Sequence, residues 1–197
     1  MTVGEPALDA PGPTPGSAPQ RVVVIGTSGA GKSTLSEPLA RWIGAEHIEL
    51  DGIQHGPNWA QTPIEVFRER VAERAQQPRW VFDGNYIDKV SQTLWPLADT
   101  VIWLDIPLRV ILPRLARRSL SRILRGTELW SGNREGWSAL LGRNSVLLWA
   151  VRSHRRHQRE LPERLAALAG TGTRVVRLRS SAEADRWLAD VTDPKRS

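Results

Sequence analysis

Short apolar runs alternate along the chain with longer segments in which apolar residues recur every three or four positions. The short runs predict five buried strands, at residues 21–25, 47–51, 80–82, 101–105 and 174–178. The periodic segments predict helices, at about residues 32–44, 63–77, 88–98, 107–124, 137–158, 161–168 and 182–190. This alternation is typical of βαβ units, so we predict an α/β fold with a five-stranded parallel sheet in a three-layer α/β/α sandwich.

Prolines and tryptophans add detail to this pattern. Pro63 and Pro107 each stand at a helix start, where the missing backbone N–H costs no hydrogen bond. Pro113 falls inside the helix predicted for 107–124, so we expect a kink or a local break there. Five tryptophans fall on apolar faces and are expected in the core: Trp42, Trp80, Trp103, Trp149 and Trp187.

Length and composition suit one domain. A chain of 197 residues with 40% hydrophobic residues can bury a single core. Residues 1–19 are rich in Pro, Gly and Ala and have almost no large apolar side chains. We therefore predict a disordered tail at 1–19 and one folded domain at 20–193.

Composition also disfavours several kinds of function. The chain has no Cys, which excludes disulfides and thiol catalysis, and its four His lack a zinc-ligand spacing. No apolar run approaches the roughly 20 residues of a membrane span, and the N-terminus has no signal pattern. We therefore expect a cytoplasmic protein with no membrane span, either a monomer or a homodimer.

Positive charge is concentrated in one part of the chain. Lys and Arg number 27 against 21 Asp and Glu, a net charge of +6, and most of the Arg excess lies between residues 105 and 159. The Arg-rich segment 109–159 could bind nucleotides, phosphorylated substrates or nucleic acid. The alternative is that these arginines form solvated helix faces, and composition leaves both interpretations open.

The segment between the first predicted strand and the first predicted helix matches the phosphate-binding pattern G-x-x-x-x-G-K-[ST]. Its residues are Gly26, Thr27, Ser28, Gly29, Ala30, Gly31, Lys32, Ser33 and Thr34. Glycines let backbone N–H groups turn toward one point, and the helix N-terminus adds a positive dipole end. We expect Lys32 to reach the β- and γ-phosphates of ATP and the Ser33 hydroxyl to bind Mg²⁺.

Beyond this loop the chain resembles a family of small P-loop kinases. Acidic residues at strand ends and two later arginines share the layout of adenylate, shikimate and gluconate kinases: Asp51, Asp83 with Gly84, Asp105, Arg114 and Arg118. Two blocks are similar to those of the adenylate kinase-related DNA topology modulation (FlaR-like) proteins, namely residues 47–51 with 57–59, and residues 80–86. The resemblance covers roughly residues 21–190 and implies a P-loop kinase fold, ATP and Mg²⁺.

The resemblance implies roles for these groups. Asp83 would help to hold Mg²⁺, and Asp51 would orient or deprotonate the acceptor hydroxyl. Arg114 and Arg118 are four residues apart, so they share a helix face and would neutralise the phosphoryl group during transfer. The alternatives are aspartates that merely form turns and arginines on a solvated helix.

The acceptor is expected to bind at residues 52–78. Trp59 and Phe67 could stack on a ring of the acceptor, and Arg68 could contact an acceptor phosphate. Asn85 and Tyr86 stand where adenylate kinases carry an arginine that grips the monophosphate. This departure puts a monophosphate acceptor in doubt and suggests hydrogen bonds to a less charged acceptor.

A shortened lid is expected at residues 125–136. Arg125, Arg134 and Arg143 are candidates to close onto the triphosphate. Arg152 is a further candidate anion contact, because its neighbours suggest a half-buried helix face.

The sequence therefore favours an ATP- and Mg²⁺-dependent kinase that acts on a small molecule, with a nucleotide or nucleoside as the first expectation. The absence of the guanine-reading pattern Asn-Lys-x-Asp favours ATP over GTP. The alternatives are a nucleotide-regulated DNA-binding protein that uses segment 109–159, and an ATPase.

Overall fold

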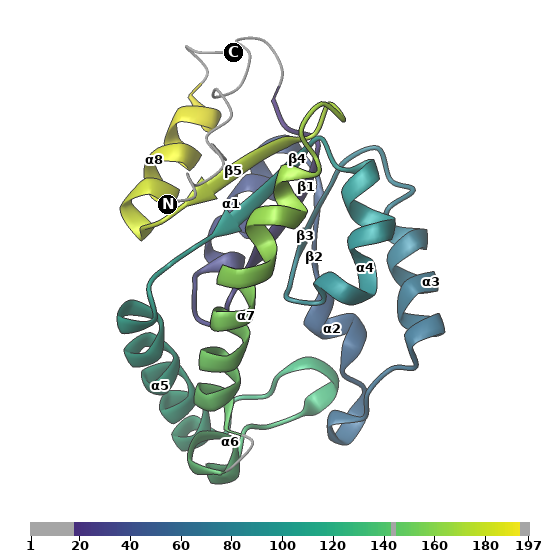
Figure 1. Ribbon diagram of the computed structural model, residues 1–197. Helices are drawn as coiled ribbons and strands as arrows, with labels where there is room; N and C mark the ends of the chain where they lie inside the picture. The colour runs from purple at the N-terminus through teal and green to yellow at the C-terminus, as the bar shows by residue number, and fades with distance from the viewer. Residues whose placement is uncertain (1–17, 143–144, 194–197) are drawn as a thin grey trace.

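The computed structural model describes residues 18–142 and 145–193. Most of the predicted tail at 1–19, and also Arg143, lie outside the described residues. Within them, five strands form one parallel sheet in the order β2-β3-β1-β4-β5 (Figure 1). The strands are β1 (Arg21–Gly26), β2 (Glu46–Glu49), β3 (Trp80–Asp83), β4 (Thr100–Leu104) and β5 (Arg174–Leu178). The predicted five-stranded parallel sheet is confirmed.

Helices cover both faces of this sheet (Figure 1). One face carries α1 (Lys32–Ile43) and α8 (Ser181–Thr192). The other face carries α3 (Ile64–Arg74), α4 (Ile87–Leu94) and α7 (Val146–Ala166). The shorter or peripheral elements are α2 (Leu50–Gln54), α5 (Leu108–Arg125) and α6 (Trp137–Leu141), with 3₁₀ turns η1 (Pro57–Trp59), η2 (Trp95–Leu97) and η3 (Trp130–Gly132). The predicted three-layer α/β/α sandwich is confirmed.

The central strand β1 shows why the sheet needs both layers. Successive side chains of a strand point to opposite faces of the sheet. Val23 and Ile25 join the apolar cluster under α3, α4 and α7, while Val22 and Val24 join the cluster under α1 and α8. Apolar side chains on both faces are typical of parallel strands, which helices cover on each side.

The tryptophans expected in the core divide into three groups. Trp80 and Trp103 are fully buried, and Trp42 and Trp187 pack partly buried against the cluster under α1 and α8. Trp149 is 47% exposed, so its assignment to the core is wrong. The buried side chains of α7 belong to a different face of the helix, formed by Ala150, His157, Leu161 and Leu165.

The second strand is shorter than predicted. It ends at Glu49, and the next five residues form α2. Leu50 is buried and packs so closely on Gly84 that a Cβ there would lie 2.7 Å from the Leu50 Cβ. Asp51 therefore stands on a short helix, and the prediction that it closes a strand is wrong.

The helices after residue 136 also differ from prediction. The long helix predicted at 137–158 is interrupted, because α7 begins afresh at Val146 with the Ser145 hydroxyl accepting a hydrogen bond from the Leu148 N–H. The same helix then continues to Ala166, so the separate helix predicted at 161–168 is not separate. α5 runs without interruption through Pro113, so the alternative of a local break is wrong.

The carboxyl ends of the parallel strands meet at one edge of the sheet, where ligands bind in open α/β folds. The phosphate-loop motif follows β1 and α2 follows β2 at this edge. The loop between α5 and α6 reaches across it, and its turn η3 contacts α2 and η1 (Figure 1). Across the part of the chain that the structure describes, no helix combines the length and apolar character needed to cross a bilayer.

Candidate active site

The phosphate-loop motif forms a tight turn between β1 and α1. Gly26, Gly29 and Gly31 have φ angles of 155°, 85° and 97°, which side chains other than glycine rarely adopt. A Cβ on Gly26 would lie 2.8 Å from the Leu104 carbonyl oxygen of the neighbouring strand. The glycines therefore meet a backbone requirement at the start of the loop, as the motif implies.

The polar side chains of the loop are oriented by their neighbours. Lys32 is largely buried, and its Nζ donates a hydrogen bond to the Gly26 carbonyl oxygen at 3.1 Å. Thr27 Oγ1 lies 3.5 Å from His154 Nδ1, and the Gly26 N–H donates to Asn85 Oδ1 at 3.3 Å. Asn85 therefore contacts the phosphate loop, whereas the sequence suggested that it contacts the acceptor.

The remaining loop residues lie around the N-terminus of α1. Ser33 and Thr34 are exposed on its first turn, Ser28 is half-buried and Ala30 is buried. The free N–H groups of this turn are suited to bind an anion, and the exposed hydroxyl oxygens are suited to bind a cation.

Asp83 ends β3 beside the loop and is only 2% exposed. His47 Nε2 donates a hydrogen bond to Asp83 Oδ2 at 2.7 Å. Burial alone would lower the pKa of His47, but the hydrogen bond and the charge of Asp83 outweigh it and raise this pKa. His47 thus fixes the orientation of the Asp83 carboxylate, a role the sequence did not indicate.

Lys32 lies in the field of the acidic residues at this edge. Burial lowers the pKa of Lys32, while the charges of Asp83 and Asp51 raise it. The structure therefore brings three predicted site residues together, from β3, α1 and α2, although they are distant in the sequence.

Asp51 belongs to a short chain of hydrogen bonds. Tyr86 Oη donates to Asp51 Oδ1 at 2.7 Å and lies 3.2 Å from His55 Nε2. Because the single phenolic proton goes to the carboxylate, His55 Nε2 must be the donor to Tyr86 Oη. Burial and the neighbouring Asp51 charge raise the pKa of Tyr86, so it stays a neutral donor.

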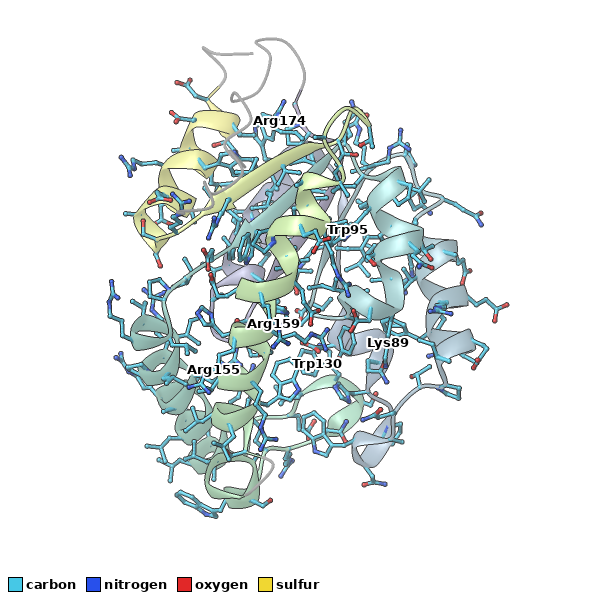
Figure 2. All side chains as sticks on the ribbon, in the orientation of Figure 1. Lys89, Trp95, Trp130, Arg155, Arg159 and Arg174 are labelled. Carbon is cyan, nitrogen blue, oxygen red and sulfur yellow. The ribbon has the colours of Figure 1, made fainter. Side chains whose placement is uncertain are left out.

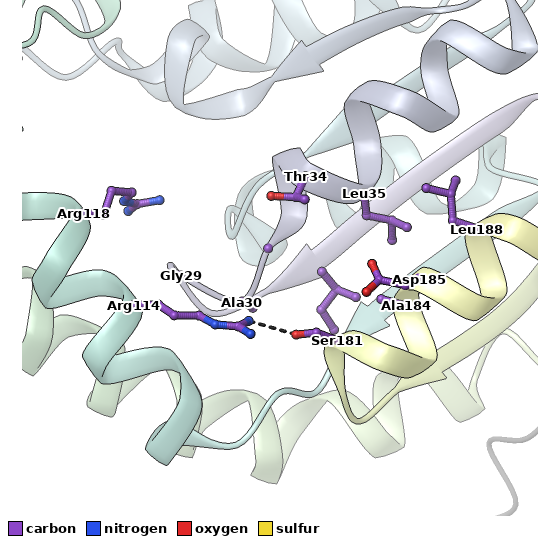
Figure 3. Close-up of a pocket in the computed structure, with 12 residues that line it drawn as sticks. Gly29, Ala30, Thr34, Leu35, Arg114, Arg118, Ser181, Ala184, Asp185 and Leu188 are labelled. Atoms are coloured by element: carbon purple, nitrogen blue, oxygen red, sulfur yellow. Dashed lines mark hydrogen bonds between the residues drawn. The ribbon is translucent and has the colours of Figure 1, made fainter.

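Arg114 and Arg118 point from α5 toward the phosphate loop, where they line a cavity of about 420 Å³ (Figure 3). Arg114 Nη1 donates to Ser181 Oγ at 2.9 Å across this cavity. Desolvation and the nearby Arg122 lower the pKa of Arg118, and the charges of Glu135, Asp51 and Glu49 partly offset this shift. The rest of the wall is mainly loop backbone and the side chains of Leu35, Leu104, Ala184, Asp185 and Leu188.

Asp105, at the end of β4, has a structural partner. Its Oδ2 accepts hydrogen bonds from Arg177 Nε and Nη2 at 3.0 and 2.8 Å. The Arg177 guanidinium also lies 4.4 Å from the centre of the Trp103 ring. This pair ties β4 to β5 and does not reach the cavity.

The residues proposed for the acceptor differ in their access. Trp59 is 39% exposed on η1, so a ring could reach it. Phe67 is fully buried against Tyr86, with ring centres 5.3 Å apart, so the expectation that it stacks on an acceptor is wrong. Arg68 is exposed on α3, and its Nε donates to the Lys89 carbonyl oxygen at 3.0 Å.

The segment expected to be a lid, residues 125–136, is joined to the segment expected to bind the acceptor by Asn133. Its Nδ2 donates to the Gly56 carbonyl oxygen and its Oδ1 accepts from the Trp59 N–H, both at 2.9 Å. Arg134 forms an exposed ion pair with Glu128 at 2.6 Å. This pair joins two positions near the ends of the segment, so the Arg134 guanidinium is bound within residues 125–136.

Arg152 does not lie on a half-buried face of α7. It is exposed, as is Leu148 at 45%, so the expectation behind its selection is wrong. The periodic pattern predicted a helix here, but the face of the helix that contacts the core was predicted wrongly.

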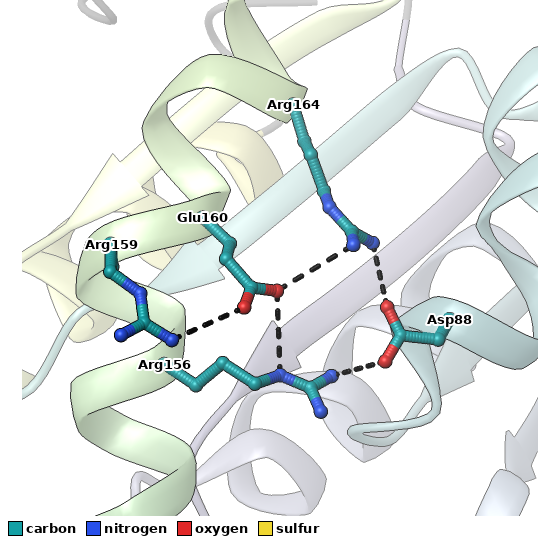
Figure 4. Close-up of polar contacts among 5 residues, drawn as sticks. All are labelled: Asp88, Arg156, Arg159, Glu160 and Arg164. Atoms are coloured by element: carbon teal, nitrogen blue, oxygen red, sulfur yellow. Dashed lines mark hydrogen bonds and ion pairs between the residues drawn. The ribbon is translucent and has the colours of Figure 1, made fainter.

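Part of the positive charge of segment 109–159 is neutralised on the surface of the fold (Figure 4). Arg156 Nη2 lies 2.5 Å from Asp88 Oδ2 and its Nε lies 3.4 Å from Glu160 Oε2. Arg164 Nη1 lies 2.9 Å from Asp88 Oδ1, and Arg159 lies 3.6 Å from Glu160. Exposed pairs of this kind contribute little to stability, about 0–1 kcal/mol each, but they reduce the net charge of the face.

His157 carries a testable consequence for stability. Burial, followed by repulsion from Lys32 and Arg156, lowers its pKa to about 4, while the unfolded chain has a value near 6.5. The folded state binds this proton less well than the unfolded chain does. The contribution of neutral His157 to stability is therefore fully present above pH 6.5 and is lost as the pH falls from 6.5 toward 4. Between pH 7.5 and 5.0 we expect His157 to reduce the free energy of unfolding by about 2 kcal/mol.

Urea unfolding of the wild type and of His157→Leu at the two pH values measures this effect. The wild type should lose about 2 kcal/mol more than the variant on acidification. An equal loss in both proteins would contradict the assignment of a neutral buried imidazole.

Comparison with known proteins places this geometry in a wider context. No protein-family model matches the chain. A cytidylate kinase of Pyrococcus horikoshii is 28% identical over 112 residues, a match that covers 49% of this chain and 56% of that protein. The match thus spans about half the length of that relative.

Solved structures share the fold over most of the chain. A shikimate kinase of Bacteroides thetaiotaomicron has a TM-score of 0.50 and 15% identity, with 88% of this chain and 96% of that chain covered. A gluconokinase of Sinorhizobium meliloti has a TM-score of 0.50 and 18% identity, covering 89% and 94%. A shikimate kinase of Acinetobacter baumannii, solved with shikimate, has a TM-score of 0.52 and 16% identity, covering 86% and 89%.

Proposed function

We propose that the protein is a P-loop kinase that transfers the γ-phosphoryl group of ATP to a hydroxyl group of a small molecule. The observation that carries the proposal is the convergence of Lys32, Asp51, Asp83 and Arg118 on one edge of the sheet. The likeness to nucleotide and small-molecule kinases supports it. The finer resemblance to DNA topology modulation proteins rests on residues 47–51, 57–59 and 80–86 and belongs to the same proposal.

The triphosphate would lie along the loop from Gly26 to Thr34. Backbone N–H groups of the loop and Lys32 would bind its phosphates, and Arg114 and Arg118 would neutralise charge on the phosphoryl oxygens during transfer. The cavity beside Arg114 would receive the base, because its walls include apolar side chains next to the loop. To accept a ligand there, the hydrogen bond between Arg114 and Ser181 would open.

The donor set at this edge fits Mg²⁺. The exposed Ser33 hydroxyl and the Asp83 carboxylate are hard oxygen ligands, and the hydrogen bond from His47 involves only Oδ2 of Asp83. Mg²⁺ in kinases is held by one or two protein groups together with the phosphates, and it would supply charge neutralisation there.

Asp51 would orient the acceptor hydroxyl and take its proton. The acceptor oxygen then forms a bond to the γ-phosphorus while the bond from that phosphorus to the bridging oxygen of ADP breaks. Tyr86 holds Asp51 Oδ1 in place, and Asp51 Oδ2 would face the acceptor. A nucleotide or a nucleoside remains the first class of acceptor to examine.

ADP release coupled to a spectrophotometric readout tests this proposal. With MgATP and a panel of nucleosides, nucleotides and hydroxylated metabolites, we expect at least one acceptor to raise the rate about 10-fold or more over the rate without acceptor. ADP formation at one rate, whatever acceptor is offered, would contradict a kinase and leave an ATPase.

Binding of DNA by segment 109–159 is the competing proposal. Arg152 and Arg155 are exposed on one side of α7 and could contact phosphates. If they do, affinity for duplex DNA should fall steeply between 50 and about 200 mM salt. The ion pairs of Arg156 and Arg159 on the same helix make this the weaker of the two proposals.

A further inference from the structure

Three carboxylates gather where the acceptor hydroxyl would have to approach. Glu49 ends β2 and is the register partner of Asp83 on β3. Asp51 follows two residues later on α2. Burial first, and then the charges of Asp83 and Asp51, raise the pKa of Glu49, which means that the three side chains feel one another.

Two of these carboxylates have neutral polar groups as neighbours. Tyr86 Oη donates to Asp51 Oδ1 at 2.7 Å, and the Trp130 side chain lies close enough to Glu49 to lower its pKa in part. Neutral donors satisfy the oxygens but leave the negative charge in place. His47 is hydrogen-bonded to Asp83, so the positive charge of a protonated His47 is paired with the Asp83 carboxylate.

Trp130 brings an apolar ring to the same place. It reaches from the lid toward α2 (Figure 2) and lies over Gly52, where an added Cβ would be 3.0 Å from Trp130 Cδ1. Its ring is roughly parallel to that of His55, at 29° with centres 6.4 Å apart. The acceptor side of the site is therefore aromatic and acidic.

Two cations beside the acceptor segment, Arg68 and Lys89, donate hydrogen bonds to neutral protein oxygens, so they keep their charges but are held by those contacts. Arg68 lies on the exposed side of α3 with its Nε on the Lys89 carbonyl oxygen. Lys89 Nζ donates to Gln54 Oε1 at 2.7 Å. The position after Gly84 is Asn85, whose side chain accepts from the phosphate loop. Lys32 and Arg118 are assigned to the triphosphate in the proposed function.

We propose that the phosphoryl acceptor is a hydroxylated ring compound without an anionic group, neutral or cationic, and that Glu49 selects it. This inference rests on the proposed kinase function and names its acceptor class. A carboxylate- or phosphate-bearing acceptor would face Glu49 and Asp51, and Arg68 Nε and Lys89 Nζ would have to leave their present hydrogen bonds to contact it. Repulsion between an anionic acceptor and the Glu49 and Asp51 carboxylates in a partly buried site is enough for a selectivity of about 10- to 100-fold.

Ring acceptors with and without an anionic group test the inference. Cytidine is compared with cytidine monophosphate, and glucosamine and glucose with glucuronate, by kcat/KM for acceptor-dependent ADP release. We expect each uncharged or cationic member to exceed its anionic partner by about 10-fold or more. Glu49→Gln should shrink this ratio by about 5-fold or more while the KM for ATP stays unchanged.

Glu46→Gln is the matched control. Glu46 is on the same strand, but it is exposed and paired with Arg74, so the acceptor ratio should not change. If Glu49→Gln changes only the melting temperature and leaves the ratio alone, the selecting role of Glu49 is overturned.

Calorimetric titration of the same compounds into the MgADP-loaded protein separates this inference from the proposed function. Turnover that prefers cytidine monophosphate or glucuronate would keep the kinase and overturn the acceptor class. Binding of the uncharged member alone, without turnover, would overturn the kinase while supporting the charge selection. Tighter binding of the anionic member would overturn the selection in either case.

Discussion

Replacing Lys32 with methionine is expected to lower acceptor-dependent kcat/KM by about 10³-fold or more. Methionine keeps most of the volume of the buried side chain but removes the ammonium group. That group is the cation closest to the loop, since its Nζ already lies 3.1 Å from the Gly26 carbonyl oxygen. Without it, the negative charge on the β- and γ-phosphates loses its main counter-charge. Coupled ADP release over a range of ATP concentrations measures the loss.

Lys89→Met provides the control for Lys32→Met. Lys89 lies on α4 and its Nζ contacts Gln54, away from the phosphate loop. The KM for ATP should therefore stay within about 3-fold of the wild type in this variant. Because burial lowers the pKa of Lys32, removing this charge should not unfold the protein, and thermal melting checks that. A Lys32→Met protein that folds and keeps more than a tenth of the activity would refute the assigned role.

Asp83→Asn is expected to lower kcat by about 10²-fold or more and to raise the Mg²⁺ concentration needed for half-maximal rate. An amide has nearly the same shape and can still accept the hydrogen bond from His47, but it lacks the charge that binds a divalent cation. The two effects should appear together, because one carboxylate would serve both metal binding and transfer. A Mg²⁺ titration of initial rates at saturating ATP measures them.

His47→Gln separates metal binding from orientation in this second prediction. The carboxylate of Asp83 remains, but its donor is changed, so the Mg²⁺ requirement should shift less than in Asp83→Asn. Asp99→Asn is a distant control, because that carboxylate accepts from the backbone N–H of Gln20 and Arg21 at the opposite end of the strands. An Asp83→Asn protein with an unchanged Mg²⁺ dependence would contradict the metal role.

Most elements of the fold follow from local patterns. Apolar runs predicted the strands, because a parallel strand is buried on both faces and reads as a continuous hydrophobic segment. The wrong predictions concern strand ends and helix faces that tertiary contacts decide. β2 stops at Glu49, and the next residue, Leu50, packs on Gly84, which lies 34 positions later in the chain. α7 presents Ala150 and Leu161 to the core, and Trp149 to solvent, because of how the helix lies on the sheet.

The candidate site divides in the same way. The phosphate loop could be predicted because its residues are consecutive and the glycines answer a local demand on the backbone. His47 and Glu49 could not be predicted as site residues, since each acquires its partner from another strand. A local signal was present, because residues 47, 49 and 51 occupy alternate positions and would share one face of a strand. Which face of the sheet that is depends on the neighbouring strand.

The sequence by itself determined the fold class, the phosphate loop and the presence of acidic and basic groups after the strands, because these are written in contiguous patterns. Only the tertiary structure decided which charges meet. It paired Asp105 with Arg177, turned Arg68 and Arg152 outward, and placed Glu49 beside Asp83. The physical reason is that strand order and helix rotation are set by packing of the whole core, whereas charge contacts at the edge follow from that packing.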